Sequence, residues 1–130
     1  MFPGYIYGDD TNSLIKNAYA YIQPSDVEGL SPVILTAMAL KTPLICSDIK
    51  ENLFIVGDMA LIFEKGNVED LIRMIQFSLE NPDVLVDNAK RGKIHVEKEF
   101  SWEKIIDQKV KLLLSISGKN QPKPRVRRRR

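Results

Sequence analysis

"SDVEGLSPVILTAMALKTPLI", residues 25–45, decides the fold of this chain, because its character changes abruptly after Ser31. An acidic loop that contains Gly29 leads through Pro32 into an apolar stretch. A serine hydroxyl suits the N-cap of a helix, and proline suits the first helical position because an N–H there has no intrahelical partner to lose. The stretch therefore predicts a helix that begins at Pro32, and its nearly continuous apolar composition predicts that the helix is buried.

Short apolar segments bounded by turn residues surround this helix and predict four strands, at residues 2–7, 19–25, 42–48 and 59–64. The segment 42–48 does not alternate between apolar and polar residues, which is typical of a parallel sheet covered on both faces. Helical patterns lie between these strands, and three more follow one another from residue 67 onward. The fold class predicted is α/β: a partial Rossmann-like, doubly wound parallel sheet of about four strands, followed by C-terminal helices.

Length and charge divide the chain into a folded part, residues 1–116, and a basic tail, residues 117–130. The tail contains seven basic residues and no acid, whereas the rest carries twelve basic and seventeen acidic residues. An acidic body argues against a fold that binds nucleic acid specifically through a basic face. We expect the tail to be disordered. It is either a solvated end or a weak contact to anionic lipid, to which each arginine adds about 1 kcal/mol.

The single cysteine, Cys46, excludes an internal disulfide, and no apolar run is long enough for a membrane span. The expected location is therefore cytoplasmic, with peripheral membrane contact through the tail as the alternative. We expect Cys46 to be a core residue and His95 to be a surface or packing residue. The sequence contains no metal-ligand cluster and no Walker phosphate loop.

The loop before Pro32 has the chemistry of an anion site. A helix N-terminus carries about half a positive charge and free backbone N–H groups. Gly29 lets a ligand approach closely, so the amides of Gly29, Leu30 and Ser31 can bind phosphate, while Glu28 can accept hydrogen bonds from sugar hydroxyls. The alternative is an ordinary turn in which Gly29 relieves the backbone and Glu28 is solvated. The residues alone leave both interpretations open.

The stretch "GYIYGDD…LIKNAYAYIQPSDVEGLSPVILTAMALKTPLICSDIKENLFIVGD" resembles the carboxyl-terminal, donor-binding half of the group-one, family-four retaining glycosyltransferases of GT-B fold. The motifs occur in the family's order: "GY", "PS…EG", the "AMA" helix, a strand ending in "SD", and "FSW" before the final helix. The resemblance covers about residues 2–114. Several motifs in correct order and spacing make it specific.

The resemblance implies that a nucleoside-diphosphate sugar donates a hexose, with retention, to a glycan or lipid acceptor, as in polysaccharide biosynthesis. We expect no metal and no cofactor. The donor-binding residues it implies are Gly29, Leu30 and Ser31 for the phosphates, Glu28 for the sugar, Thr36 near the ribose, and Tyr5 and Ile6 beside the base. It places no catalytic residue in this chain, since the family's amino-terminal domain binds acceptor and supplies catalytic groups.

This sequence departs from the family at three points. Thr36 stands where the family has a second glutamate, and losing a hydrogen bond to a charged group lowers donor affinity by about one to two orders of magnitude. Lys41 stands where a small glycine is usual. Two strands that precede "GY" in the family, with a basic residue that meets the donor phosphates, are not in the sequence.

In the usual strand order 3-2-1-4-5-6, the two missing strands would lie between residues 2–7 and residues 19–25. An open parallel edge favours association. We therefore expect self-association or a partner chain that supplies the missing strands, and no turnover by this chain alone. The alternative function is a non-catalytic interaction module or one half of a split glycosyltransferase. Asp48 and Glu51 lie at the carboxyl end of the strand at 42–48. The resemblance suggests that they are loop residues near the donor sugar, and helix capping is an equal alternative for Asp48.

Overall fold

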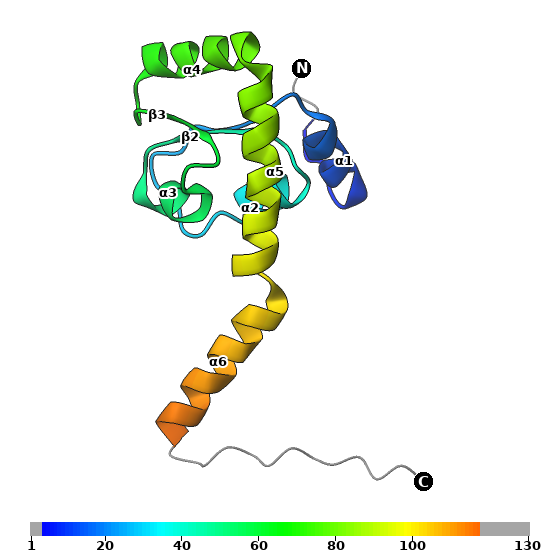
Figure 1. The fold of residues 1–130 in the computed structure, drawn as a ribbon, viewed down its shortest axis with the longest axis vertical. Helices are drawn as coiled ribbons and strands as arrows, with labels where there is room; N and C mark the ends of the chain where they lie inside the picture. Colours follow the sequence, from blue (N-terminus) through cyan, green and yellow to red (C-terminus); the bar gives the residue numbers. More distant parts are fainter. Residues whose placement is uncertain (1–3, 118–130) are drawn as a thin grey trace. The chain divides into compact units, whose positions relative to one another are not determined.

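The computed structural model describes residues 4–117, in which helices and strands alternate as far as β3 and three helices follow (Figure 1). Residues 1–98 and 99–130 form two compact units, and each is described by itself. The elements are α1 (Asp9–Asn17), β1 (Tyr21–Gln23), α2 (Pro32–Ala39), β2 (Leu44–Ser47), α3 (Lys50–Val56), β3 (Leu61–Phe63), α4 (Val68–Glu80), α5 (Pro82–Glu99) and α6 (Trp102–Ser117).

The three strands form one parallel sheet in the order β1-β2-β3. Ile45 of β2 lies opposite Ile22 of β1 and Leu61 of β3. All four residues of β2 are buried, as expected for a strand covered on both faces. The predicted α/β class and the parallel sheet are therefore confirmed.

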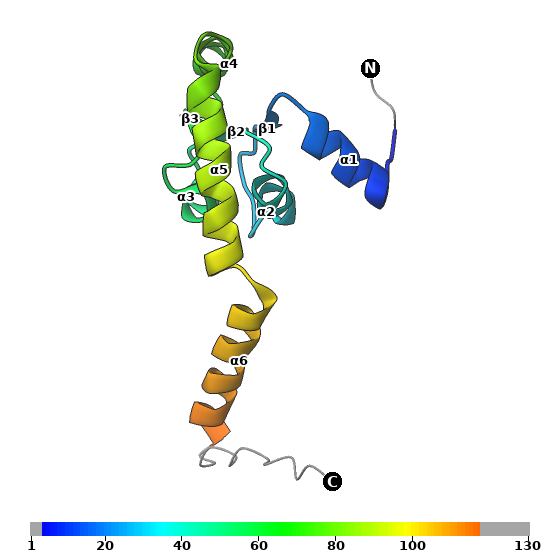
Figure 2. The same ribbon diagram turned by 45° about the vertical axis from the view of Figure 1, so that its right-hand side comes forward.

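The prediction of about four strands is an overcount by one. Residues 4–7 form no strand, and residues 1–3 lie outside the described part of the chain. Tyr5 and Tyr7 are 91% and 77% exposed, and their rings stack with centroids 6.1 Å apart. A strand needs a neighbour to satisfy its backbone groups. Figure 2 shows this segment on the far side of α1 from β1, and within residues 4–117 no strand lies beside it.

Helix α2 begins at Pro32 with Ser31 at the N-cap, as predicted. Its buried residues are Ile34, Ala37 and Met38, whereas Val33 is 39% exposed. The helix is thus buried on one face rather than all round. Side-chain caps form at two other helix starts: Asn67 Oδ1 accepts from the N–H of Asp70 (3.0 Å), and Ser101 Oγ accepts from the N–H of Lys104 (3.3 Å).

Helix α5 packs closely against α2 at Gly92. Gly92 is buried, and a Cβ added there would lie 3.3 Å from Cε of Met38. Glycine lowers the intrinsic stability of a helix interior. Here the missing side chain lets the two helices approach, which explains why α5 continues through this position. The core around this contact is formed by Ile34, Ala37, Met38, Leu44, Ile45, Cys46, Ile55, Val56, Phe63, Leu85, Ala89 and Val96.

Lys41 ends α2 in the left-handed backbone region, with φ of 61°. The N–H of Thr42 donates to the carbonyl of Ala37 (2.9 Å), and the N–H of Lys41 donates to that of Met38 (3.0 Å). This is the hydrogen-bond pattern of a Schellman-type helix end, in which glycine is the usual left-handed residue. The tight corner that the family makes with glycine therefore forms here with lysine.

Replacing Lys41 by glycine is expected to raise the free energy of unfolding by about 1 kcal/mol, because the left-handed conformation costs an L-residue roughly that much. Urea denaturation followed by circular dichroism measures the change. Lys90→Gly is the matched control, since Lys90 is exposed inside α5 and loses about 1 kcal/mol by helix propensity. If both variants were destabilised equally, Lys41 would not be strained.

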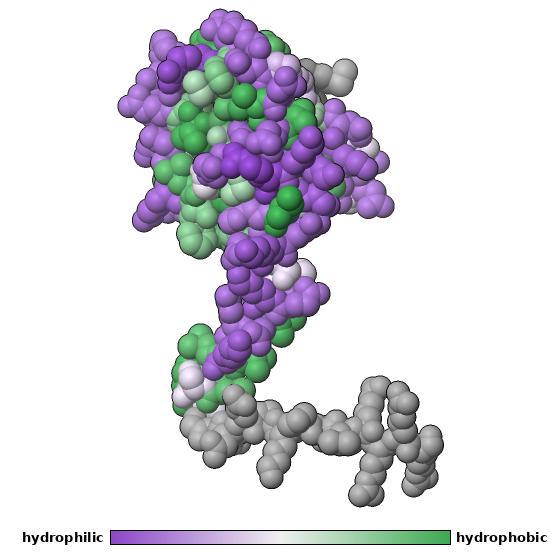
Figure 3. Space-filling model, in the orientation of Figure 1, coloured by the Kyte–Doolittle hydropathy of each residue, from purple (hydrophilic) through white to green (hydrophobic). Residues whose placement is uncertain are grey.

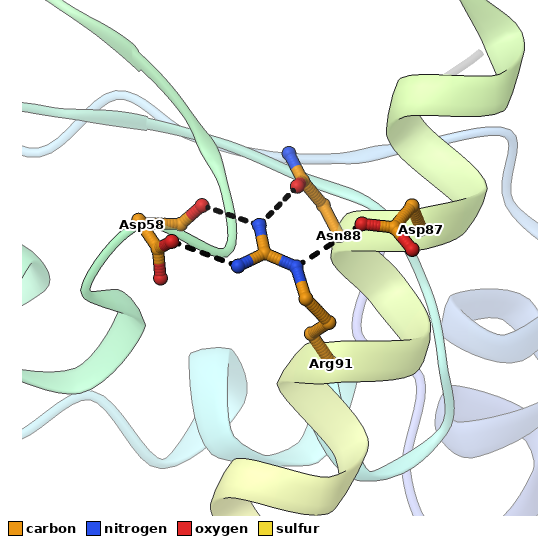
Figure 4. Close-up of polar contacts among 4 residues, drawn as sticks. All are labelled: Asp58, Asp87, Asn88 and Arg91. Carbon is orange, nitrogen blue, oxygen red and sulfur yellow. Dashed lines mark hydrogen bonds and ion pairs between the residues drawn. The ribbon is translucent and has the colours of Figure 1, made fainter.

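Arg91 of α5 joins its helix to the turn between α3 and β3 (Figure 4). Its guanidinium donates to Asp58 Oδ2 (2.7 Å), to the Asp58 carbonyl (3.0 Å), to Asn88 Oδ1 (2.8 Å) and to Asp87 Oδ2 (3.1 Å). The hydrogen bond and the charge of Arg91 lower the pKa of Asp58. A single side chain thus holds the turn after α3 against α5.

Arg91→Met is expected to lower the melting temperature at pH 7. Because the pKa of Asp58 is lower in the folded protein than its ordinary 3.8, its contribution is present above that pH and is lost as the pH falls through the folded value. The difference between variant and wild type should therefore shrink in acid, as measured by thermal melts over a pH series. Lys111→Met, which removes an exposed helical ion pair with Asp107, should change little. A pH-independent difference would contradict the role of Asp58.

Candidate functional site

The carboxyl ends of the three parallel strands meet at one edge of the sheet and carry three loops, at residues 24–31, 48–49 and 64–67. Ser47 Oγ donates to the carbonyl of Ser25 (2.6 Å), and Asn52 Nδ2 donates to Ser47 O and Oγ (both 3.1 Å). The N–H of Lys65 donates to Asp48 Oδ1 (2.8 Å). These bonds hold the three loops together at the edge where doubly wound sheets bind ligands.

Glu28 is anchored within this edge rather than simply solvated. Its Oε1 accepts hydrogen bonds from Gln23 Nε2 and Ser25 Oγ, both at 2.7 Å. Tyr21 in turn donates to Gln23 Oε1 (2.8 Å), and burial, followed by the charge of Glu28, raises the pKa of Tyr21. Within residues 4–117 no hydrogen bond reaches Oε2 of Glu28. The carboxylate is thus fixed by one oxygen and can accept further bonds with the other.

The backbone amides of Gly29, Leu30 and Ser31 lie just before α2 and donate to no acceptor in the described part of the chain. Ser31 is only 4% exposed, yet its hydroxyl makes no cap hydrogen bond. Gly29 has no positive φ, and a Cβ added to it would meet nothing within 4 Å. The loop therefore combines free N–H groups with open space beside Gly29.

A cavity of about 410 Å³ opens at this loop and is lined by Gly29, Leu30, Lys50, Glu51 and Phe54. A second hollow of about 380 Å³ shares Lys50 and Glu51 with it. Phe54 is 72% exposed, an unusual exposure for an aromatic side chain beside a polar loop. The cavity therefore lies between the loop before α2, which contributes Gly29 and Leu30, and helix α3, which contributes Lys50, Glu51 and Phe54.

The predicted site residues are only partly brought together. Gly29 and Leu30 line the cavity, and Glu28 and Ser31 lie on the same loop. Thr36 lies one turn into α2, and its hydroxyl donates to the carbonyl of Pro32 (2.9 Å). Tyr5 and Ile6, before α1, do not line this cavity.

The sequence predictions missed Lys50 and Phe54, although Glu51 was anticipated. A signal was present: Lys50 lies three residues after the end of a buried parallel strand, where ligand loops occur. Asp48 does not cap α3, whose N-cap is Ile49. It accepts from Lys65 instead, so the capping alternative is wrong.

Other reactive side chains do not form a site. Cys46 is fully buried, and burial raises the pKa of its thiol to about 12, which confirms it as a core residue. Within residues 4–117 no three His, Cys, Asp or Glu side chains group as metal ligands. Over the same residues no helix is both long and apolar enough to cross a bilayer.

Several known proteins are similar to this chain in sequence, in fold or in both. The family model for "Glycosyl transferases group 1" matches residues 1–95. O-antigen chain mannosyltransferase B of Escherichia coli is 30% identical over 107 residues, which cover 82% of this chain and 28% of that protein. Glycosyltransferase 1 domain-containing protein 1 of Xenopus tropicalis is 30% identical over 112 residues, covering 82% of this chain and 31% of that protein.

Two solved structures have a fold similar to that of this chain. Sucrose-phosphate synthase from Thermosynechococcus elongatus superposes with a TM-score of 0.72 and 28% identity, covering 78% of this chain and 26% of that one. TarM superposes with a TM-score of 0.71 at 18% identity, covering 82% of this chain and 22% of that one, and supports the fold alone.

These matches define a glycosyltransferase domain of GT-B type. The chain belongs to the group 1 glycosyltransferase family, as its motifs predicted. It spans less than a third of the length of the curated relatives it matches.

Proposed function

We propose that the loop before α2 binds the diphosphate and sugar of a nucleoside-diphosphate sugar donor. The observation that carries this proposal is that the amides of Gly29, Leu30 and Ser31 lack acceptors within the described residues, and that two of these residues, Gly29 and Leu30, line a cavity of about 410 Å³. Backbone N–H groups at a helix N-terminus favour phosphate oxygens. Family membership supports the same ligand class.

Lys50 and Glu28 complete the proposed donor site. Lys50 lines the cavity with an exposed ammonium, and the one ion pair it makes within residues 4–117 is a long contact of 3.7 Å to Glu51, so it can meet a phosphate. Glu28 is already fixed through Oε1, so its Oε2 can accept from sugar hydroxyls without a large cost in side-chain entropy.

The remaining donor contacts are weaker. Thr36 is proposed near the ribose. Its hydroxyl already donates to the Pro32 carbonyl, and it accepts hydrogen bonds from ribose hydroxyls less strongly than a carboxylate would. Tyr5 and Ile6 are proposed beside the base, and this requires the exposed segment before α1 to close toward the donor.

The reaction proposed for the whole protein is transfer of a hexose, with retention, to a glycan or lipid acceptor on the cytoplasmic side, where donor sugars are made. No metal or cofactor is proposed. We propose that residues 1–130 bind donor without turning it over, since the family resemblance implies that the acceptor site and catalytic groups belong to an amino-terminal domain. Incubation with radiolabelled donor and glycan acceptors tests this, and robust transfer would contradict it.

A second candidate function is a non-catalytic module or one half of a split glycosyltransferase. The observation that favours it is the sheet edge at β1, which pairs with β2 on one side and with no other strand in the described residues. A second copy or a partner chain could supply the missing neighbours. Size-exclusion chromatography with light scattering tests self-association, and a monomer that binds donor normally would count against it.

Gly29→Val is expected to lower the affinity for nucleoside-diphosphate sugars at least about tenfold, because the new side chain fills the space beside the free amides. Its melting temperature should stay unchanged, since the backbone is unstrained and nothing lies within 4 Å. Isothermal titration with uridine and guanosine diphosphate sugars measures binding, and differential scanning fluorimetry measures stability.

Lys50→Met and Lys90→Met form a matched pair, since both remove one exposed positive charge but only Lys50 lines the cavity. Loss of a charged hydrogen bond should weaken donor binding by about tenfold or more in Lys50→Met, while Lys90→Met should bind like wild type. Wild-type protein that binds none of these donors, or equal binding by both variants, would overturn the proposed site.

A further inference from the structure

Glu28 is held by hydrogen bonds that begin inside β1. The hydroxyl of Tyr21 donates to Gln23 Oε1 (2.8 Å), and Gln23 Nε2 donates to Glu28 Oε1 (2.7 Å). Gln23 Nε2 also donates to Ser25 Oγ (2.8 Å), whose own proton goes to Glu28 Oε1 (2.7 Å). Two donors, which we call the Glu28 clamp, therefore meet at one oxygen of the carboxylate, and each is itself fixed by a further hydrogen bond.

Tyr21 sets which end of the Gln23 amide faces Glu28. A side-chain amide has a carbonyl oxygen that accepts and an NH₂ group that donates. Because the Tyr21 hydroxyl donates to the oxygen, the NH₂ group is turned toward the carboxylate. The reverse orientation would place two acceptor oxygens against each other. Burial, followed by the charge of Glu28, raises the pKa of Tyr21, so its hydroxyl stays protonated and donates at neutral pH.

The loop that carries Ser25 is braced from the core of the sheet. Ser47, the last residue of β2, donates from Oγ to the Ser25 carbonyl (2.6 Å) and accepts from Asn52 Nδ2 (3.1 Å). Ser47 and Asn52 are 1% and 0% exposed, whereas Glu28 is half-buried. Hydrogen bonds thus connect buried groups of β2 and α3 to a loop whose carboxylate reaches the edge of the sheet.

We propose that Gln23 and Ser25 are positioning residues that hold Glu28 so that its second oxygen, Oε2, accepts from a hydroxyl of the donor sugar. This inference rests on the proposed function, in which Glu28 binds the sugar. Both clamp donors bond to Oε1, so a ligand meets Oε2. A carboxylate repels phosphate and accepts strongly from hydroxyl groups. The clamp therefore serves recognition of the sugar, while the amides before α2 serve the diphosphate.

Fixing the carboxylate in advance strengthens binding of the sugar. A mobile glutamate loses rotamer freedom when a ligand orders it, whereas a clamped one has already lost that freedom in the folded protein. The free amides of Gly29, Leu30 and Ser31 belong to the backbone and need no carboxylate. Loss of the clamp should therefore weaken binding of a nucleoside-diphosphate sugar and leave binding of the free nucleoside diphosphate unchanged.

Isothermal titration of the full chain with UDP-glucose and GDP-mannose, and with free UDP and GDP, tests this difference. Gln23→Met should lower affinity for the sugar nucleotide about tenfold and leave that for the free diphosphate unchanged, because a hydrogen bond to a charged group is lost. Ser25→Ala should lose affinity in the same way, and Ser25→Thr, which keeps a hydroxyl, should retain it. Tyr21→Phe should cause a smaller loss, about threefold, because it removes only the bond that orients the amide.

A double-mutant cycle tests whether Gln23 acts through Glu28. In a Glu28→Ala background, Gln23→Met should cause no further loss of affinity, because no carboxylate is left to position. Gln76→Met is the matched control, since Gln76 is exposed on α4. Figure 3 shows a largely hydrophilic face of residues 4–98, where loss of one exposed amide should change neither affinity. Melting temperatures check that each variant is folded, and Tyr21→Phe replaces Gln23→Met in the comparison should the latter unfold.

Several outcomes would overturn the inference. They are equal losses of affinity for the sugar nucleotide and the free diphosphate in Gln23→Met, unchanged affinity for both, and additive effects of Gln23→Met and Glu28→Ala. Wild-type protein that binds the diphosphates and gains nothing from the sugar would overturn the clamp and leave the phosphate site standing. Protein that binds neither ligand would overturn the proposed function as well.

Discussion

The burial of β2 between two parallel neighbours is the constraint on which the larger unit depends. Its four residues are all buried, and its pairings place β1 and β3 in register on either side. Parallel pairing brings the three carboxyl ends to one edge. Ser47, the last residue of β2, then bonds both to the loop after β1 and to Asn52 of α3. The position of the candidate site therefore follows from the burial of β2 and from its parallel pairing with β1 and β3.

The sheet edge that carries the candidate site has one carboxylate held by hydrogen bonds and several backbone amides without acceptors in the described residues. Glu28 is held by Gln23 and Ser25, which belong to the same strand end, while the amides before α2 are left without acceptors in the described residues. One buried polar atom, Oδ1 of Asn52, also lacks a partner there. A buried polar group without a partner costs free energy in a folded protein.

Much of this fold could be predicted because local signals were strong. Ser31 and Pro32 predicted the start of α2, a helical pattern from residue 67 predicted α4, and the unalternating segment around Cys46 indicated a buried parallel strand. The first strand was predicted wrongly, since "FPGYIY" has strand composition but no neighbour in the described residues to pair with. The family motifs pointed to Gly29, Leu30 and Glu28. Lys50 and Phe54 were missed because their approach to Gly29 depends on how α3 packs, which no local pattern reveals.

Cys46 has a practical consequence. The chain has one thiol, which is fully buried and keeps its proton far above neutral pH, so maleimide reagents would find almost no thiolate to attack. A cysteine introduced at an exposed position would then carry a dye or a spin label alone, with the native background left in place.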